Sequence, residues 1–519
     1  MTWRHYLLLA LLGLAVVTLV AAFQPSPGYM DANYYYAGGV QLVNGHGFTD
    51  PYLWNYLDNP VGLPHPSHAY WMPLASLLAA AGGLLFGSAS WFAARIGFLL
   101  VAALIPPITA GLAWSFTSRR DLALLSGLLA VFPAFYLTFL PVTDSFGLYM
   151  LFGGLFFLVL KRKPSVLNSL LLGFLAGLMH LARADGLIWL LLAFIAVLLF
   201  RKSDRQFTSM LLSSIAVLAG YLLVMAPWFI RNNAVFGSFL APGGSKMLWL
   251  TSYDQLFGYP ASQITASAWW QSGLQAILRV RFWSLGVNLS NMVSVQGEVF
   301  LLPLVGLGLW HLRKDRRVQL AVLAWLLTLA AMTVVFPFAG ARGGFFHSGA
   351  ALQTVWWALA PLGLDRLIAW GSRKRGWNAA QAGTVFRSGL VVLAVLLTAV
   401  VVYGRVLGGG GGTPWGQENV AYSNIDTVLR EQGMSAQAVV MVADPPGFYL
   451  ASGNPAIAVP DGDLNTLLLV SQRYGANYLI LEVGSTPGRL IEVYDHPAGQ
   501  AGLQYLGEVG GAHLYAIQP

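Results

Sequence analysis

Two aspartates stand at the ends of long apolar runs, where a carboxylate could do chemistry at a membrane surface. Asp31 comes shortly after the first run, and Asp144 comes directly before a later one. A carboxylate in such a place can take a proton from an acceptor nucleophile. Asp31 could instead be a surface acid that caps an interfacial helix, and Asp144 could be the N-cap of the helix that follows it. Asp144 could both take part in proton transfer and cap the helix that follows it.

Three arginines occupy similar boundaries and could bind an anionic group. Arg342 lies in the glycine-rich stretch 340–344, which suits a diphosphate-like or phosphate leaving group, although it could also be a membrane-interface anchor. Arg183 could bind phosphate or merely neutralise Asp185. Arg231 ends another apolar run, where snorkelling to the interface is the default explanation.

The elements that must position these residues are membrane helices. Of 519 residues, 56% are hydrophobic and 10% are charged, against about 25% charged residues in soluble domains. Several apolar runs between Tyr6 and Leu407 reach the roughly 17 to 25 residues that span a bilayer. The net charge of +8 comes from short basic clusters between these runs, which argues against a nucleic-acid partner. Without cysteine, thiolate catalysis and disulfides are excluded.

Basic clusters between apolar runs predict the cytoplasmic side of each loop. They all fall on one side only if the run from 71 to 87, which is short and contains Pro73 and the pair Gly82-Gly83, does not cross the membrane. We therefore expect an interfacial helix there. The clusters are Arg119-Arg120, Lys161-Arg162-Lys163, Arg201-Lys202 with Arg205, Arg313-Lys314 with Arg316-Arg317, and Arg373-Lys374-Arg375 with Arg387.

The predicted fold is a polytopic α-helical membrane protein of about eleven spans, with interfacial helices in the first external loop. Residues 1–407 form the membrane domain, with a retained first span, a cytoplasmic N-terminus and external loops at 24–95 and 231–296. A glycine linker at 408–412 leads to a small extracytoplasmic α/β domain at 413–519. In this domain we predict strands at 439–442, 478–483 and 514–517 and a helix at 464–474.

Motifs around the candidate residues resemble those of one family. The first loop opens with Gly28-Tyr29-Met30-Asp31-Ala32-Asn33-Tyr34-Tyr35-Tyr36-Ala37 and continues with Gly45-His46-Gly47 and His65-Pro66. Asp144, Arg183-Ala184-Asp185-Gly186 and Pro227-Trp228-Phe229-Ile230-Arg231-Asn232 follow at matching places. Over about residues 1–370, the chain resembles the GT-C membrane glycosyltransferases. It is most similar to the glycosyltransferase 39-like group of protein O-mannosyltransferases and the lipid A aminoarabinose transferase.

This resemblance implies a transferase in the plasma membrane that moves a sugar from a polyprenyl-phosphate donor to a protein, lipid or glycan acceptor at the outer face. Asp31 is then the general base, and Asp144 assists it or orients the acceptor. The residues implied in donor-phosphate binding are Arg342, Arg183 and Arg231, and those implied in substrate binding are Tyr34, Tyr35, His65 and His347.

No metal-ligand motif is complete in the sequence. His46, His65 and His68 share one loop, but Pro66 prevents a helical ligand pair, and we favour a polar surface group. Many relatives carry a second acid directly after the first, where this chain has Ala32. A divalent metal stays possible without support from a ligand motif.

Two other functions fit the same composition. A transporter or flippase of lipid-linked glycans would place ionisable residues near the middle of its spans, where Glu298 is the main candidate. A polymerase or ligase of whole glycans would use the same kind of donor at the same face. The large loop directly after the first span favours the transferase. Nucleotide-driven transport, zinc proteolysis and hydride transfer lack their usual motifs.

Overall fold

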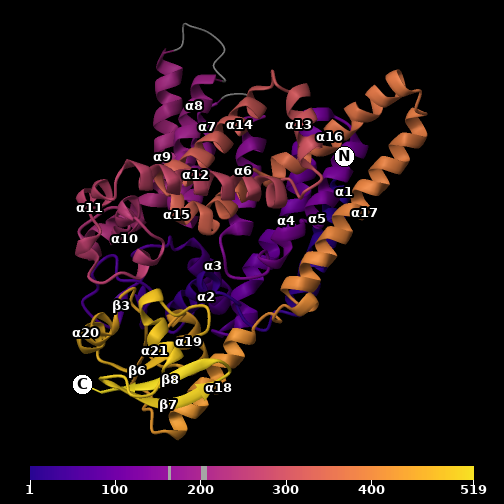
Figure 1. The fold of residues 1–519 in the computed structure, drawn as a ribbon. Coiled ribbons are helices and arrows are strands. Elements are labelled where there is room, and N and C mark those ends of the chain that lie inside the picture. Colours follow the sequence, from indigo (N-terminus) through magenta and orange to yellow (C-terminus); the bar gives the residue numbers. More distant parts are fainter. Residues whose placement is uncertain (162–164, 200–206, 519) are drawn as a thin grey trace.

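The computed structural model describes residues 1–161, 165–199 and 207–518, and helices make up most of it (Figure 1). Among the described residues, five helices are long and apolar enough to cross a membrane: Trp3–Ala21 (α1), Trp91–Thr117 (α4), Thr208–Phe236 (most of α9, which begins at Phe207), Arg316–Val335 (α14, Arg316–Ala330, with the turn after it) and Ala379–Arg405 (α17). The other bundle helices are α5 (Arg120–Val131), α6 (Phe146–Leu160), α7 (Val166–Ala182), α8 (Leu187–Leu199), α12 (Leu274–Asn291), α13 (Leu302–His311) and α16 (Phe345–Arg375). The number of crossings stays a prediction.

The contacts between α1 and α4 show where the first loop begins and ends. Trp91 Nε1 donates a hydrogen bond to the Gln24 carbonyl oxygen (3.0 Å), and Arg95 donates to the same oxygen (2.9 Å). The loop therefore leaves α1 and returns to α4 at one end of the bundle. The apolar run from 71 to 87 lies between these two points, and its failure to cross the membrane stays a prediction. It forms the 13-residue helix α3 (Leu74–Phe86), about 20 Å long, which is too short to span a bilayer.

Glycines bring α7 and α9 into backbone contact. A Cβ on Gly173 would lie 1.9 Å from the Val217 carbonyl oxygen, and one on Gly220 would lie 2.1 Å from the Leu170 carbonyl oxygen. In lipid, the hydrophobic effect does not drive helices together. Close backbone approach therefore stabilises the pair through dispersion contacts. The pair fixes the end of α7, and Arg183 directly follows that end.

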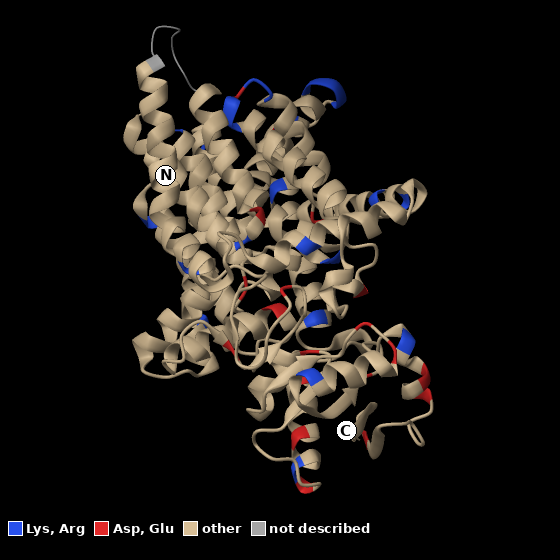
Figure 2. Cartoon of the chain, turned by 90° about the vertical axis from the view of Figure 1, so that its left-hand side faces the viewer, with Lys and Arg blue, Asp and Glu red and all other residues tan. Residues whose placement is uncertain are grey.

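Three of the predicted basic clusters meet at one end of the bundle. Arg119 pairs with Asp365 (2.7 Å), Arg387 also pairs with Asp365 (2.9 Å), and Arg317 donates to Ser115 Oγ (2.8 Å). We call this the basic end; it lies opposite the C-terminal region (Figure 2). In two further clusters, Arg162, Lys163, Arg201, Lys202 and Arg205 lie outside the described residues.

At the other end, the first loop and the C-terminal region share one sheet. Its strands run in the order β2-β5-β4-β6-β8-β7, and β2 (Tyr52–Leu53) of the first loop pairs in parallel with β5 (Ala456–Ala458). The first loop also contains α2 (Met30–Val43) and the short pair of β1 (Thr49–Asp50) and β3 (His65–Pro66). Helix α2 packs against α3 on one side and against α19 (Pro445–Ser452) of the C-terminal region on another.

The elements predicted for the C-terminal region are confirmed. Strand β4 covers Val439–Val442 and helix α20 covers Leu464–Tyr474, as expected, while β6 (Ala476–Leu481) and β8 (Ala512–Ile517) each begin two residues earlier than predicted. The remaining elements are α18 (Gln417–Glu431), α21 (Ile491–Asp495) and β7 (Leu503–Val509). The pairing of β2 with this sheet was not predicted, and the domain boundary at 413 stays a prediction.

Candidate active site

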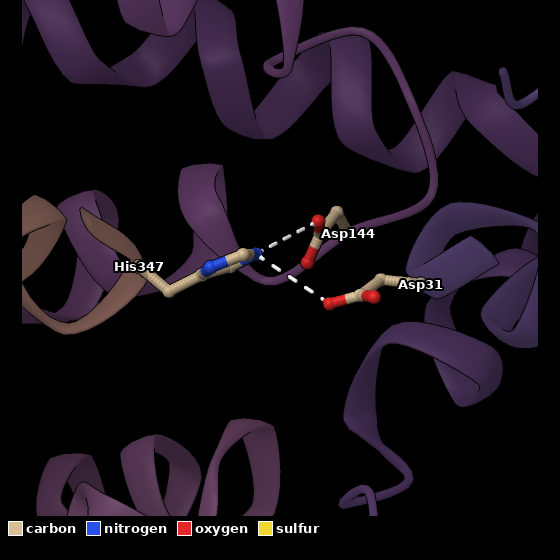
Figure 3. Close-up of side chains that lie close together, drawn as sticks. All are labelled: Asp31, Asp144 and His347. Atoms are coloured by element: carbon tan, nitrogen blue, oxygen red, sulfur yellow. Dashed lines mark hydrogen bonds and ion pairs between the residues drawn. The ribbon is translucent and has the colours of Figure 1, made fainter. Parts of the chain in front are cut away.

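Three helix N-termini converge at the end of the bundle opposite the basic end. Asp31 lies in the first turn of α2, Asp144 lies two residues before α6, and His347 lies in the first turn of α16. His347 Nε2 is 3.1 Å from Asp144 Oδ2 and 3.9 Å from Asp31 Oδ2 (Figure 3). Helix N-termini carry partial positive charge, so this arrangement favours carboxylates and bound anions.

The carboxylate of Asp144 is buried and fully engaged. Oδ2 accepts a hydrogen bond from the Tyr29 hydroxyl (2.5 Å), and Oδ1 accepts one from the hydroxyl of Ser145 (3.1 Å). Burial alone would raise its pKa, but His347 and these donors together hold the pKa below the ordinary value. Asp144 therefore stays ionised and organises its neighbours. Ser145, not Asp144, occupies the N-cap position of α6.

The carboxylate of Asp31 faces open space, with its side chain 32% exposed. Desolvation and the nearby charge of Asp144 raise the pKa of Asp31 to about 6, while His347 and Arg183 oppose this rise. A carboxyl group with a pKa near the working pH is suited to general-base catalysis. Of these two carboxyl groups, Asp31 is thus the one with the raised pKa and with access to the cavity.

The position of its two nitrogens limits the chemistry of His347. Nδ1 lies 2.9 Å from the Gly343 carbonyl oxygen, an acceptor, so Nδ1 carries a proton. Nε2 then either carries a second proton, making an imidazolium ion between two carboxylates, or offers its lone pair. The ring stacks on Phe146 at 3.8 Å between centroids.

The same three side chains could hold a metal ion. One ligand atom each from Asp31, Asp144 and His347 lies within 4.8 Å of the others. Carboxylate oxygen and the imidazole lone pair suit a divalent ion such as Zn²⁺ or Mn²⁺. These three ligands come from segments far apart in the chain and form no local ligand motif, so sequence patterns could not predict the group.

A cavity of about 390 Å³ opens beside Asp31. Two cations line it. Arg342 is exposed and lies over the ring of Tyr253 at 4.7 Å, with no ion pair among the described residues. Arg183 also lines the cavity but pairs with Asp185 through Nε and Oδ1 (3.0 Å). The cavity thus offers one unpaired and one paired guanidinium to an anionic ligand.

An aromatic wall faces these cations. Trp54 stacks on Trp71 with ring centroids 4.0 Å apart and an interplanar angle of 10°, and Tyr70 packs edge-on against Trp54. Tyr35 completes the wall, four residues after Asp31 on the same face of α2. Of these residues, only Tyr35 was predicted. The others follow the quoted first-loop motifs by a few residues and have no periodic signal of their own.

Four predicted residues lie outside the cavity lining: Asp144, which is buried beside it, and Arg231, Tyr34 and His65. Arg231 donates to the Ser67 carbonyl oxygen (2.9 Å) and stacks on Trp228. The Tyr34 hydroxyl donates to Asp50 (3.0 Å), and His65 bonds to Asp58 (2.6 Å). These contacts hold the first loop together.

The histidines of the first loop do not gather at a metal site in the described structure. His65 is bonded to Asp58, His46 Nδ1 lies 2.8 Å from the Gln41 side-chain oxygen, and Nδ1 of His68 lies 3.1 Å from the Trp71 carbonyl oxygen. The prediction of a surface histidine group was wrong for His68, which is 1% exposed. Burial lowers the pKa of His68 to about 3, so it is neutral.

The fold is that of the GT-C membrane glycosyltransferases, as the sequence motifs implied. No protein-family model and no curated protein matches the sequence. The chain is similar to the oligosaccharyltransferase AglB from Archaeoglobus fulgidus in complex with an inhibitory peptide and a dolichol-phosphate, with a TM-score of 0.60 and 12% identity over 95% of this chain and 71% of AglB. It is also similar to ArnT from Cupriavidus metallidurans bound to undecaprenyl phosphate, with a TM-score of 0.53 and 14% identity over 98% of this chain and 97% of ArnT.

Proposed function

We propose that this chain is a glycosyltransferase that moves a sugar from a polyprenyl-phosphate donor to an acceptor, with Asp31 as general base. The observation that carries the proposal is the cavity itself, in which a carboxylate of raised pKa faces Arg342 and Arg183. The bound dolichol-phosphate of AglB and undecaprenyl phosphate of ArnT support a lipid-phosphate donor.

The reaction is a single displacement at the anomeric carbon. Asp31 takes the proton from the acceptor hydroxyl as the acceptor oxygen bonds to the anomeric carbon. The bond from this carbon to the phosphate oxygen breaks, and the polyprenyl phosphate leaves with the electron pair. Its growing negative charge lies next to Arg342 and Arg183.

The proposed orientation places the cavity on the non-cytoplasmic side. Arg119, Arg317 and Arg387 meet at the opposite end of the bundle, and basic loops favour the cytoplasm. The N-terminus would then be cytoplasmic and the C-terminal region extracytoplasmic. A lipid donor could reach the cavity sideways from the outer leaflet.

A transporter of lipid-linked glycans has less support. Its ionisable residues should line a path through the spans, but Asp31, Asp144 and Arg342 gather at one end. Glu298, the main candidate for such a path, is buried and accepts a hydrogen bond from Trp357 Nε1 (2.6 Å).

The decisive experiment is the Asp31→Asn variant of the full chain in detergent. Donors are undecaprenyl-phosphate-linked glucose, mannose, galactose and arabinose; the acceptor is the cell-envelope fraction of the source organism, and the release of undecaprenyl phosphate is measured. We expect the rate to fall by about 100-fold or more. The matched control is Asp463→Asn, because asparagine also caps α20. Wild-type turnover by the Asp31 variant would remove the proposed base.

A further inference from the structure

The nine residues 25–33, which we call the catalytic segment, carry both Tyr29 and Asp31. Tyr29 donates to Asp144 and Asp31 faces the cavity, so the path of this segment decides whether the two carboxylates face His347 correctly. The membrane bundle holds its start, because Gln24 donates through its amide to the Thr138 carbonyl oxygen (2.8 Å). The rest of the segment is held from the C-terminal side of the chain.

Trp415 holds the first half of the segment. Its Nε1 donates to the Ser26 carbonyl oxygen (2.9 Å), and its ring packs edge-on against Tyr29 at 6.0 Å. Gly28 has φ +93°, and a Cβ there would lie 2.3 Å from the Trp415 ring. Trp415 is itself tied to the end of α17, since its N–H donates to the Val406 carbonyl oxygen (3.0 Å).

Asp444 holds the second half. Asn33 Nδ2 donates to Asp444 Oδ2 (2.7 Å), and Asp444 Oδ1 accepts from the Gly447 N–H (3.1 Å) at the start of α19. Both side chains are buried, Asn33 at 6% and Asp444 at 3% exposure. The carboxylate thus uses one oxygen to cap its own helix and the other to fix α2, two residues after Asp31.

The interface continues along α2, away from the cavity. Gln41 Nε2 donates to the Tyr449 hydroxyl (2.8 Å). Gln41 lies ten residues after Asp31, which is about 15 Å along a helix. The same interface therefore contains one hydrogen bond beside the catalytic residue and one well removed from it.

We propose that Trp415 and Asp444 are positioning residues, through which the C-terminal region completes the active site by fixing the segment that carries Tyr29 and Asp31. The proposal rests on the transferase function argued above and gives the C-terminal region a part in the chemistry. A misplacement of about 1 Å at a reacting group can cost about 100-fold in rate. Donor binding should be unaffected, because Arg183 and Arg342 lie on other elements.

A charge swap tests the pair of Asn33 and Asp444. Asn33→Asp alone places two carboxylates face to face. Asp444→Asn alone leaves a single side-chain oxygen at 444 to accept from both the Asn33 amide and the Gly447 N–H. The double variant restores both hydrogen bonds, since the new amide at 444 can donate to the new carboxylate at 33 and accept from Gly447. We expect kcat to fall about 10- to 100-fold in each single variant and to recover to within about threefold in the double. The affinity for undecaprenyl phosphate should stay unchanged in all three.

Tyr449→Phe is the matched control, because it removes a hydrogen bond from the same interface at the far end of α2. Melting temperatures in detergent should fall similarly in Tyr449→Phe and Asp444→Asn, but only Asp444→Asn should lose kcat. Equal kcat in the two variants, or no recovery in the double variant, would overturn the positioning role. If Asp31→Asn is inactive while Asp444→Asn is fully active, only this inference fails; if Asp31→Asn is active, the proposed function fails first.

Discussion

His347 Nε2 lies 3.1 Å from Asp144 Oδ2, and the same nitrogen lies 3.9 Å from the carboxylate of Asp31. The closer aspartate is buried and saturated with donors, whereas the farther one faces the cavity. One imidazole thus lies between a buried, hydrogen-bonded carboxylate and a carboxyl group that faces the cavity. This arrangement leads to the first two predictions.

The rate of transfer should depend on pH through the ionisation of Asp31. Its pKa is raised to about 6 by burial and by Asp144, and only the deprotonated form can accept a proton. We therefore expect kcat to be constant well above pH 6 and to fall tenfold per pH unit well below it. The measurement is the release of undecaprenyl phosphate in buffers between pH 4.5 and 8.5. A flat profile across this range would contradict the assignment of the base.

Replacing His347 with glutamine should raise the pH below which kcat begins to fall. The positive charge of His347 lowers the pKa of Asp31, so its loss lets the pKa rise further. The pH profile of His347→Gln is compared with that of His496→Gln, which changes an exposed histidine of the C-terminal region. If kcat instead begins to fall at a lower pH in His347→Gln, His347 does not act as a cation beside Asp31.

Removal of the Arg342 guanidinium should weaken binding of the lipid phosphate. Arg342 makes no ion pair among the described residues, so its charge is available to a ligand. We expect Arg342→Met to weaken binding of undecaprenyl phosphate by about tenfold or more, and Arg342→Lys to have a smaller effect. Arg281→Met is the control, because Arg281 stacks on Trp269 outside the cavity lining. Unchanged affinity in Arg342→Met would place the phosphate elsewhere.

Local patterns in the sequence predicted the elements well. Long apolar runs predicted α1, α4 and α17, and a short run of apolar residues predicted β4, because burial in lipid or in a sheet leaves a direct trace in side-chain type. The prediction that the run containing α3 does not cross the membrane came from loop charge together with its short length, Pro73 and the Gly82-Gly83 pair.

Contacts between distant segments could not be predicted in the same way. Asp31, Asp144 and His347 lie at the starts of three separate helices, and only the family resemblance suggested that they act together. Strand β2 has two residues, too few for any periodic signal. Arg231 and Tyr34 have the residue types of a binding site, but buried neighbours use their polar groups instead.

Added Zn²⁺ should inhibit the enzyme by occupying the group of Asp31, Asp144 and His347. Their ligand atoms lie within 4.8 Å of one another, which suits a single ion. Bound in this way, the ion would occupy the carboxylate of Asp31, the proposed base. We expect inhibition that EDTA reverses and that His347→Gln weakens. Activation by Zn²⁺, with loss of activity in EDTA, would instead make the ion part of the reaction.

Gly28→Ala should reduce turnover more than stability. Gly28 has φ +93°, which costs a residue with a Cβ about 1 kcal/mol or more. The new methyl group would also meet the Trp415 ring at 2.3 Å, so the catalytic segment must shift and carry Tyr29 away from Asp144. Gly45→Ala is the matched control, since Gly45 has φ +79° but nothing within 4 Å of its Cβ position. We expect a loss of melting temperature in both variants, larger in Gly28→Ala because of the contact with the Trp415 ring, and a loss of kcat of about tenfold or more only in Gly28→Ala. If the two variants turn over equally fast, the contact between Trp415 and Gly28 does not position the site.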